Sequence, residues 1–219
     1  MPAAADHAGP SAPGGTDLEA VLSRAHEEAL TLLQDPAASR LDVVSWLSAH
    51  IAAFEHAIYP SAKRRIRDGH ALLDEDRGVV ARLVRALRIA ERAHSGDVLA
   101  SNLNGERLRE RLTELVNEYR DIQHRLVSAL GQALDAAEAA SLAQEYRETL
   151  LHAPTRPHPH LHNRMLFRLD AVRDRILDTM DGRHVPVPRV ARTPITPGRW
   201  GAYLLGQQHP RTDAQPPQR

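Results

Sequence analysis

The chain of 219 residues has no cysteine, few aromatic residues and a single lysine, Lys63. Without cysteine it can form no disulfide, no thiolate metal site and no cysteine nucleophile. It also has no apolar run near the roughly 18 residues that a membrane helix needs. The first residues lack the basic and apolar segments of a secretory signal. We therefore expect a cytoplasmic protein that has no membrane partner.

Charge is distributed unevenly along the chain, although 28 basic and 28 acidic side chains cancel overall. Residues 1–153 carry 17 basic and 23 acidic side chains, whereas residues 154–219 carry 11 and 5. A basic extension can bind nucleic acid, or it can lie along an acidic surface of its own chain. We favour the second, and expect no nucleic-acid partner, because 2 Phe and 4 Tyr are too few for a base-stacking surface.

Proline is rare in the middle of the chain. Of 15 prolines, only Pro60 lies between residues 37 and 153, and ten follow residue 153. Because proline interrupts helices, the middle is free to be helical and the end mostly is not. We predict three parts: a disordered leader over residues 1–15, a helical domain over residues 16–153, and a basic, proline-rich extension over residues 154–219.

Apolar residues recur every three or four positions, which is typical of amphipathic helices. The expected helices of the domain span about residues 16–34, 39–67, 71–94 and 105–133, with a continuation to about residue 151. One more amphipathic helix is expected at about residues 163–181. Short links make successive helices antiparallel neighbours. The predicted fold is all-α, an up-down-up-down four-helix bundle with an extra C-terminal helix and a proline-rich tail.

Two histidines fall on the apolar faces of the first two predicted helices. At about 100° per residue, His26 and His50 both point inward. They lie about eleven and twelve residues from the middle of the intervening turn, so a rise of about 1.5 Å per residue puts them at one level. Such a pair can bind a metal ion, or it can consist of buried histidines hydrogen-bonded to polar neighbours. The residues alone leave both readings open.

The second predicted helix contains the segment His50-Ile-Ala-Ala-Phe-Glu-His-Ala-Ile-Tyr-Pro60. This segment resembles the second-helix signature of the hemerythrin-like (HHE cation-binding) domains, and His26 stands where that family's first-helix histidine would stand. The stretch Ala153-Pro-Thr-Arg-Pro-His-Pro159 is also similar to a segment that follows the bundle in such proteins. The resemblance covers about residues 17–160. It implies a four-helix bundle that holds a non-haem di-iron centre and binds oxygen or senses redox state.

The chain departs from the family pattern at several ligand positions. Phe54 stands where a carboxylate is expected, and only Glu55 remains of the acidic pair. In the fourth-helix repeat of the signature, Tyr119 replaces the histidine and Gln123 the glutamate, while His124 should face solvent.

The third predicted helix is apolar at the level of His50. There Asp76 and His94 face inward only near the two helix ends. Because a di-iron centre needs about six protein ligands, the sequence favours an eroded site without a cofactor.

Two functions remain open. The favoured one is a degenerate, non-catalytic binding or regulatory module of the hemerythrin-like type. The alternative is a protein that binds iron or another transition metal and has an oxygen- or redox-linked role. In that case the resemblance points to four candidate ligands: His26, His50, Glu55 and Tyr119. We do not expect an enzyme, because no nucleophile or acid–base pair is evident. A His/Pro-rich segment over residues 152–162 is expected to be an exposed loop.

Overall fold

The computed structural model describes residues 17–94, 105–158, 172–174 and 177, all within one compact unit. The predicted leader lies outside these residues, as does nearly all of the extension beyond residue 158. Of the helix predicted at about residues 163–181, the described residues 172–174 and 177 are helical.

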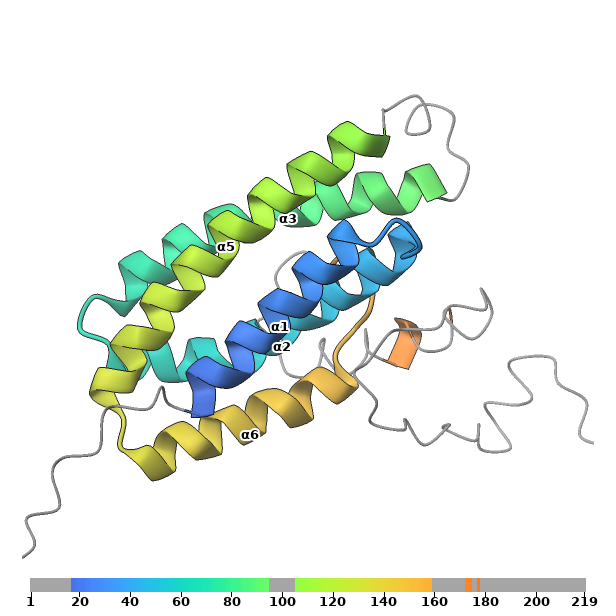
Figure 1. Cartoon of the computed structure of the whole chain (residues 1–219). Coiled ribbons are helices and arrows are strands. Elements are labelled where there is room, and N and C mark those ends of the chain that lie inside the picture. Colours follow the sequence, from blue (N-terminus) through green and yellow to red (C-terminus); the bar gives the residue numbers. More distant parts are fainter. Residues whose placement is uncertain (1–16, 95–104, 159–171, 175–176, 178–219) are drawn as a thin grey trace, which may run out of the picture. The chain divides into compact units, whose positions relative to one another are not determined.

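Long helices make up most of the described chain (Figure 1). They are α1 (Asp17–Gln34), α2 (Arg40–Arg65), α3 (Gly69–His94), α5 (Gly105–Ala133) and α6 (Ala136–His152). No strand occurs within the described ranges, so the all-α prediction is confirmed for them. None of the helices there is long and apolar enough to span a membrane.

Capping boxes start two of these helices. At α2, the Ser39 hydroxyl accepts from Asp42 N at 3.1 Å, and Asp42 Oδ2 accepts from Ser39 N at 3.0 Å. At α6, Asp135 and Glu138 make the same reciprocal pair, at 2.8 and 3.2 Å. Each box satisfies backbone N–H groups that the first helical turn leaves without intrahelical acceptors. The second box makes α6 a separate helix.

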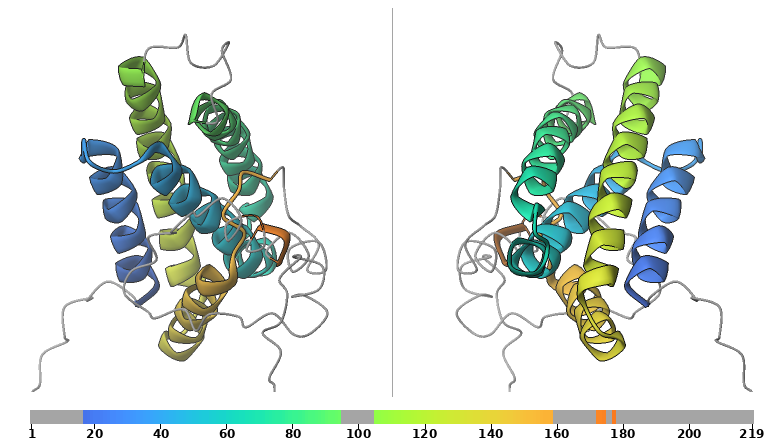
Figure 2. Two further views of the ribbon diagram at one scale, coloured as in Figure 1. Left: turned by 90° about the vertical axis from the view of Figure 1, so that its right-hand side faces the viewer. Right: turned by 90° about the vertical axis from the view of Figure 1, so that its left-hand side faces the viewer.

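Helix α2 lies at the centre of the packing. It contacts α1, α3, α5 and α6, and it is buried on most of its surface. Helix α5 completes a ring of neighbours, because it packs against both α1 and α3 (Figure 2). Helix α6 packs against α1 and α2. The core that these helices enclose includes the fully buried rings of Trp46, Phe54, Tyr119 and Tyr146.

A tight turn joins α2 to α3. Gly69 is required there, because a Cβ at this position would lie 2.6 Å from the Ala62 carbonyl oxygen. At the other end of α2, the Trp46 indole donates to the Ala25 carbonyl oxygen at 3.2 Å, which ties α2 to α1. These two contacts help to set α2 beside both of its sequence neighbours.

The segment after α6 packs onto the helices, although an exposed loop was predicted. Within the described residues 152–158, only His152 is exposed, while Ala153, Pro154, Thr155 and Pro157 are buried. Arg156 pairs with Glu91 of α3 at 3.2 Å, and its backbone N–H donates to Asp174 at 2.8 Å. The exposed-loop prediction was wrong for residues 153–158, because the alanine and proline side chains there are buried and Arg156 pairs with α3.

Candidate functional site

His26 and His50 meet in the core. Their rings are perpendicular, with centroids 4.9 Å apart, and the residues are 4% and 1% exposed. The prediction that both point inward at one level is confirmed. Their apolar helix faces place them there, since His26 lies between the buried Leu22 and Ala29 of α1. The two imidazoles therefore share one small region of the helical core.

Each histidine is hydrogen-bonded to a neutral side chain. His26 Nε2 lies 2.7 Å from Gln123 Oε1, so the imidazole N–H donates to the carboxamide oxygen. His50 Nδ1 lies 2.5 Å from the hydroxyl oxygen of Tyr146, which comes from α6. These four residues are called the histidine layer below. Tyr146 was missed from the sequence because α6 was predicted as a simple continuation of the preceding helix.

Two aromatic rings line the histidine layer at positions where the family pattern has ligands. The fully buried Tyr119 ring lies edge-on to His26 and His50, with centroid distances of 6.1 and 5.6 Å. The Phe54 ring lies 6.4 Å from both His50 and Tyr119. Both rings fill space with apolar atoms next to the imidazoles.

Burial keeps the histidine layer neutral. Desolvation lowers the pKa of His26 to about 4, and the hydrogen bond to Gln123 offsets part of that fall. Desolvation, together with the neighbouring His26, lowers the pKa of His50 well below its usual value. Desolvation raises the pKa values of Tyr119 and Tyr146. At neutral pH the two imidazoles and the two phenols are therefore all uncharged.

Two polar atoms of the layer and one beside it have no hydrogen-bond partner among the described residues. They are His50 Nε2, Gln123 Nε2 and the Tyr119 hydroxyl. Buried polar atoms of this kind usually bind water or a ligand. They are therefore the atoms with which the core could take up a small polar species.

Glu55 lies in a second polar region, called the acidic cluster below. There the Tyr59 hydroxyl donates to Asp76 Oδ2 at 2.5 Å, and the Arg77 guanidinium stacks over the Tyr59 ring at 5.5 Å. Desolvation raises the pKa of Asp76 to about 7; the Tyr59 hydrogen bond opposes this rise and the Glu55 charge adds to it. Glu55 is buried, and its charge acts on Asp76, Tyr59 and Tyr119.

Two polar residues were predicted to face inward near the ends of the third helix, and only one of them does. Asp76 is fully buried, as expected, whereas His94 is exposed, so the prediction that His94 faces inward was wrong. The last buried residue of α3 is Ala90, and the final turn extends past the core. Between Asp76 and Ala90, the buried side chains of α3 are all apolar: Val79, Val80, Leu83, Val84, Ala86 and Leu87.

The residues present fit a metal centre poorly. Among the residues that the structure describes, no group of three or more His, Cys, Asp or Glu side chains is placed to hold a metal ion. One nitrogen of each core histidine already bonds a neutral partner. Tyr119 would have to ionise to bind a metal strongly, and burial opposes that. Of the four sequence-predicted ligands, the structure pairs His26 with His50, sets Tyr119 beside them, and places Glu55 in the acidic cluster.

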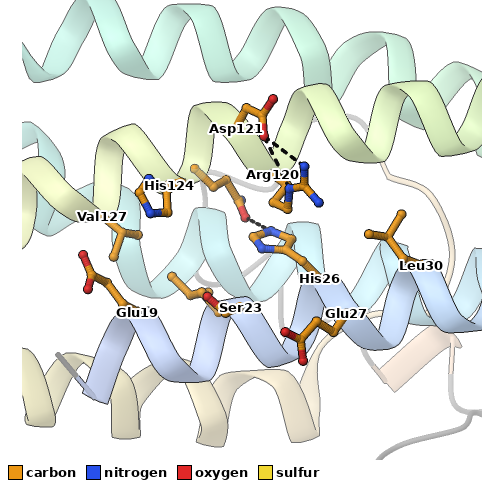
Figure 3. A pocket seen from close by; sticks show the side chains of 11 residues that line it. Glu19, Ser23, His26, Glu27, Leu30, Arg120, Asp121, His124 and Val127 are labelled. Carbon is orange, nitrogen blue, oxygen red and sulfur yellow. Dashed lines mark hydrogen bonds and ion pairs between the residues drawn. The ribbon is translucent and has the colours of Figure 1, made fainter. Parts of the chain in front are cut away.

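A pocket of about 210 Å³ opens beside His26, between α1 and α5 (Figure 3). The buried His26 and Gln123 line its inner part, and Leu22, Leu30 and Val127 supply apolar walls. The remaining lining residues are polar or charged: Glu19, Ser23, Glu27, Arg120, Asp121 and His124. His124 is exposed, as the sequence predicted. The pocket thus connects two members of the histidine layer, His26 and Gln123, to the surface.

Comparisons with protein-family models, with curated proteins and with solved structures give no match to this chain.

Proposed function

We propose that the chain is a hemerythrin-like four-helix bundle in which a neutral hydrogen-bonded layer stands in place of the metal centre. In this proposal α1, α2, α3 and α5 form the bundle, and the protein acts as a non-catalytic binding or regulatory module of the cytoplasm. The observation that carries the proposal is the pairing of His26 with Gln123 and of His50 with Tyr146.

Two further observations support the loss of a metal centre. The histidine layer contains no carboxylate, so nothing in it would balance the charge of a cluster. The only buried carboxylates of α2 and α3, Glu55 and Asp76, belong to the acidic cluster, where Tyr59 and Arg77 act on Asp76. Each of the two histidines has a neutral hydrogen-bond partner without metal, as a retained scaffold with a repacked centre requires.

The basic extension is proposed to lie along the acidic bundle of its own chain. The ion pair between Arg156 and Glu91 supports this, and so does the contact of Arg88 Nε with the Pro157 carbonyl oxygen at 3.4 Å.

A transition-metal protein is the second candidate. It is favoured by the short distance between the imidazoles and by Nε2 of His50, which has no hydrogen-bond partner among the described residues. In that case His26 and His50 would rotate away from their present partners toward a shared ion, with Glu55 or Tyr119 as further ligands. The role would then be linked to oxygen or redox state.

Elemental analysis of the full chain, produced without a histidine tag in iron- and zinc-supplemented medium, separates the two candidates. We expect less than about 0.2 metal ions per chain, which is far from a structural or catalytic stoichiometry. His26→Gln and His50→Gln should leave that content unchanged. His124→Gln is the matched control, because His124 is exposed. About one metal ion per chain that is lost in both core variants and kept in the control would overturn the proposal.

A further inference from the structure

We propose that a second pocket, which Arg40 and Arg109 line and which is called the arginine pocket below, binds a small organic carboxylate with an apolar body. The inference deepens the proposed function and rests on it, because it gives a ligand class to the binding module. The pocket has a volume of about 310 Å³. Small-molecule sites usually have volumes of about 300 to 1,000 Å³, so this one suits a compact ligand.

Four helices contribute to the arginine pocket. Leu33 comes from the end of α1, Val43 from the start of α2, Ala90 from the last part of α3 and Leu112 from the first half of α5. Figure 1 shows the turn between α1 and α2 at the same end of the helices as the C-terminus of α3 and the N-terminus of α5. No member of the histidine layer is among the described residues that line this pocket, so the two sites are separate.

The charges around the arginine pocket favour an anion. Arg40 and Arg109 line it together with a single carboxylate, Glu106. Arg109 Nη1 donates to the backbone carbonyl oxygen of Asp35 at 3.2 Å, which is a neutral acceptor. Within the described ranges, neither guanidinium is paired with a carboxylate. The lining therefore carries an excess of positive charge that attracts an anion and repels a cation.

Two carboxylates of the neighbouring turn are bound to its backbone. Asp35 Oδ1 accepts from Ala37 N at 2.8 Å, and Asp42 Oδ2 accepts from Ser39 N at 3.0 Å. Neither aspartate lines the arginine pocket. Direct pairing with these carboxylates thus does not neutralise the two arginines.

The Arg40 guanidinium reaches the start of α5. A Cβ on Gly105 would lie 2.6 Å from Arg40 Nη2, so the guanidinium occupies the space that a side chain would take there. Arg40 is exposed and Arg109 is half-buried, which leaves their donors accessible to a ligand. A guanidinium presents parallel N–H donors in a fixed fork that matches the two oxygens of a carboxylate. The two arginines therefore favour a carboxylate over a neutral head group.

The walls of the arginine pocket favour an apolar body. Leu33, Val43, Ala90 and Leu112 are buried, and the half-buried Leu108 packs against the same core. Covering these side chains with a ring or a short hydrocarbon chain removes apolar surface from water, while the carboxylate stays near the arginines. Each part of the proposed ligand thus has a counterpart in the lining.

Phenylbutyrate tests the proposal directly, with phenylbutyramide and phenylbutylamine as neutral and cationic probes of the same skeleton. The full-length ¹⁵N-labelled chain would be titrated with each at pH 7 and low salt while backbone amide shifts are followed. We expect phenylbutyrate to bind with a Kd of about 1 mM and to shift amides within residues 33–43 and 105–112. Phenylbutyramide should bind at least about fivefold more weakly, and phenylbutylamine more weakly still. Equal binding of the three probes, or amide shifts only elsewhere, would overturn the inference.

Two kinds of variant locate the site. Arg40→Gln combined with Arg109→Gln should weaken phenylbutyrate binding about fivefold or more and leave phenylbutyramide binding within about twofold. Leu108→Trp fills the pocket from a half-buried position and should abolish the shifts caused by phenylbutyrate. Arg111→Gln is the matched control, because Arg111 is an exposed arginine of α5 that pairs with Glu114 and does not line the pocket. Unchanged phenylbutyrate binding by the double variant, or an equal loss in the control, would contradict the proposed site.

Failure of this inference is distinguishable from failure of the proposed function. A metal-free chain that ignores phenylbutyrate would leave the repacked bundle in place and remove only the carboxylate site. A chain that contains stoichiometric metal and still binds phenylbutyrate at the arginine pocket would remove only the metal-free proposal.

Discussion

The histidine layer and the acidic cluster are both polar regions of one core, and they differ in charge. In the layer, His26 and His50 are kept neutral by burial and bond to neutral partners. In the cluster, Asp76 has a pKa of about 7, with Tyr59 and Arg77 beside it. Among the described residues, the inward histidines and the inward carboxylates do not come together as a group of three or more that could hold a metal ion.

Tyr59→Phe should have the largest effect, because it removes the hydroxyl that donates to the buried Asp76. We expect a loss of about 3 kcal/mol in the free energy of unfolding at pH 8, where Asp76 is largely ionised, and about 1 kcal/mol at pH 5. Urea unfolding followed by circular dichroism at both values measures the loss. Tyr146→Phe, in the neutral layer, is the control that should show no such difference between the two pH values. An equal loss for Tyr59→Phe at both would mean that Asp76 carries no charge.

Acidification should destabilise the protein through the histidine layer. The pKa of His26 is about 4 in the folded chain against 6.5 when unfolded, so below pH 6.5 the unfolded state binds the extra proton. The free energy of unfolding should therefore be lower at pH 5 than at pH 7 by on the order of 2 kcal/mol, and titration of His50 lowers it further.

Asp76 acts in the opposite direction. Its raised pKa means that the folded state holds a proton which the unfolded state has lost between about pH 4 and pH 7.

His26→Gln keeps a donor toward Gln123 and removes the titrating ring. Between pH 7 and pH 5, the free energy of unfolding of this variant should therefore fall by about 2 kcal/mol less than that of the wild type. Identical pH dependence in the two proteins would show that His26 does not titrate between the folded and unfolded states.

Tyr146→Phe should destabilise moderately, because it leaves His50 Nδ1 without its partner while the ring still fills its space. We expect a loss of about 1 to 1.5 kcal/mol at pH 7, measured by urea unfolding. A loss below about 0.3 kcal/mol would indicate that water replaces the hydroxyl at no cost.

The smallest effect should come from a surface ion pair. Arg82 of α3 and Glu118 of α5 form one between exposed side chains. Glu118→Gln should change the free energy of unfolding by less than about 0.5 kcal/mol, and by still less at high salt. A loss as large as that of Tyr146→Phe would contradict the contrast between buried and exposed polar pairs.

Much of the fold follows from local sequence signals. The apolar periodicity and the long stretch with only one proline were enough to predict the helices to within a few residues. The inward direction of His26 and His50 followed from helical periodicity, which is a local property of the chain. The same periodicity failed at His94, because it does not tell where a helix leaves the core.

The partners of the inward residues could not be predicted in the same way. Tyr146 reaches His50 only because α6 starts as a separate helix and packs against α2. Glu55 acts on Asp76, a residue of the next helix. Arg156, in the segment after α6, is bound by Glu91 and Asp174, which are distant in sequence. Such pairings are decided by tertiary packing, on which a single sequence gives little information.

The central claim is that the two core imidazoles are neutral and hydrogen-bonded, with no metal between them. It is tested most directly by long-range ¹⁵N–¹H correlation spectra of the His26 and His50 rings at pH 7, recorded before and after one equivalent of Fe(II) under anaerobic conditions. We predict ¹⁵N shifts of neutral tautomers for both rings, unchanged by the metal. Loss of both sets of ring signals at stoichiometric Fe(II), with the ring signals of exposed histidines retained, would contradict the account.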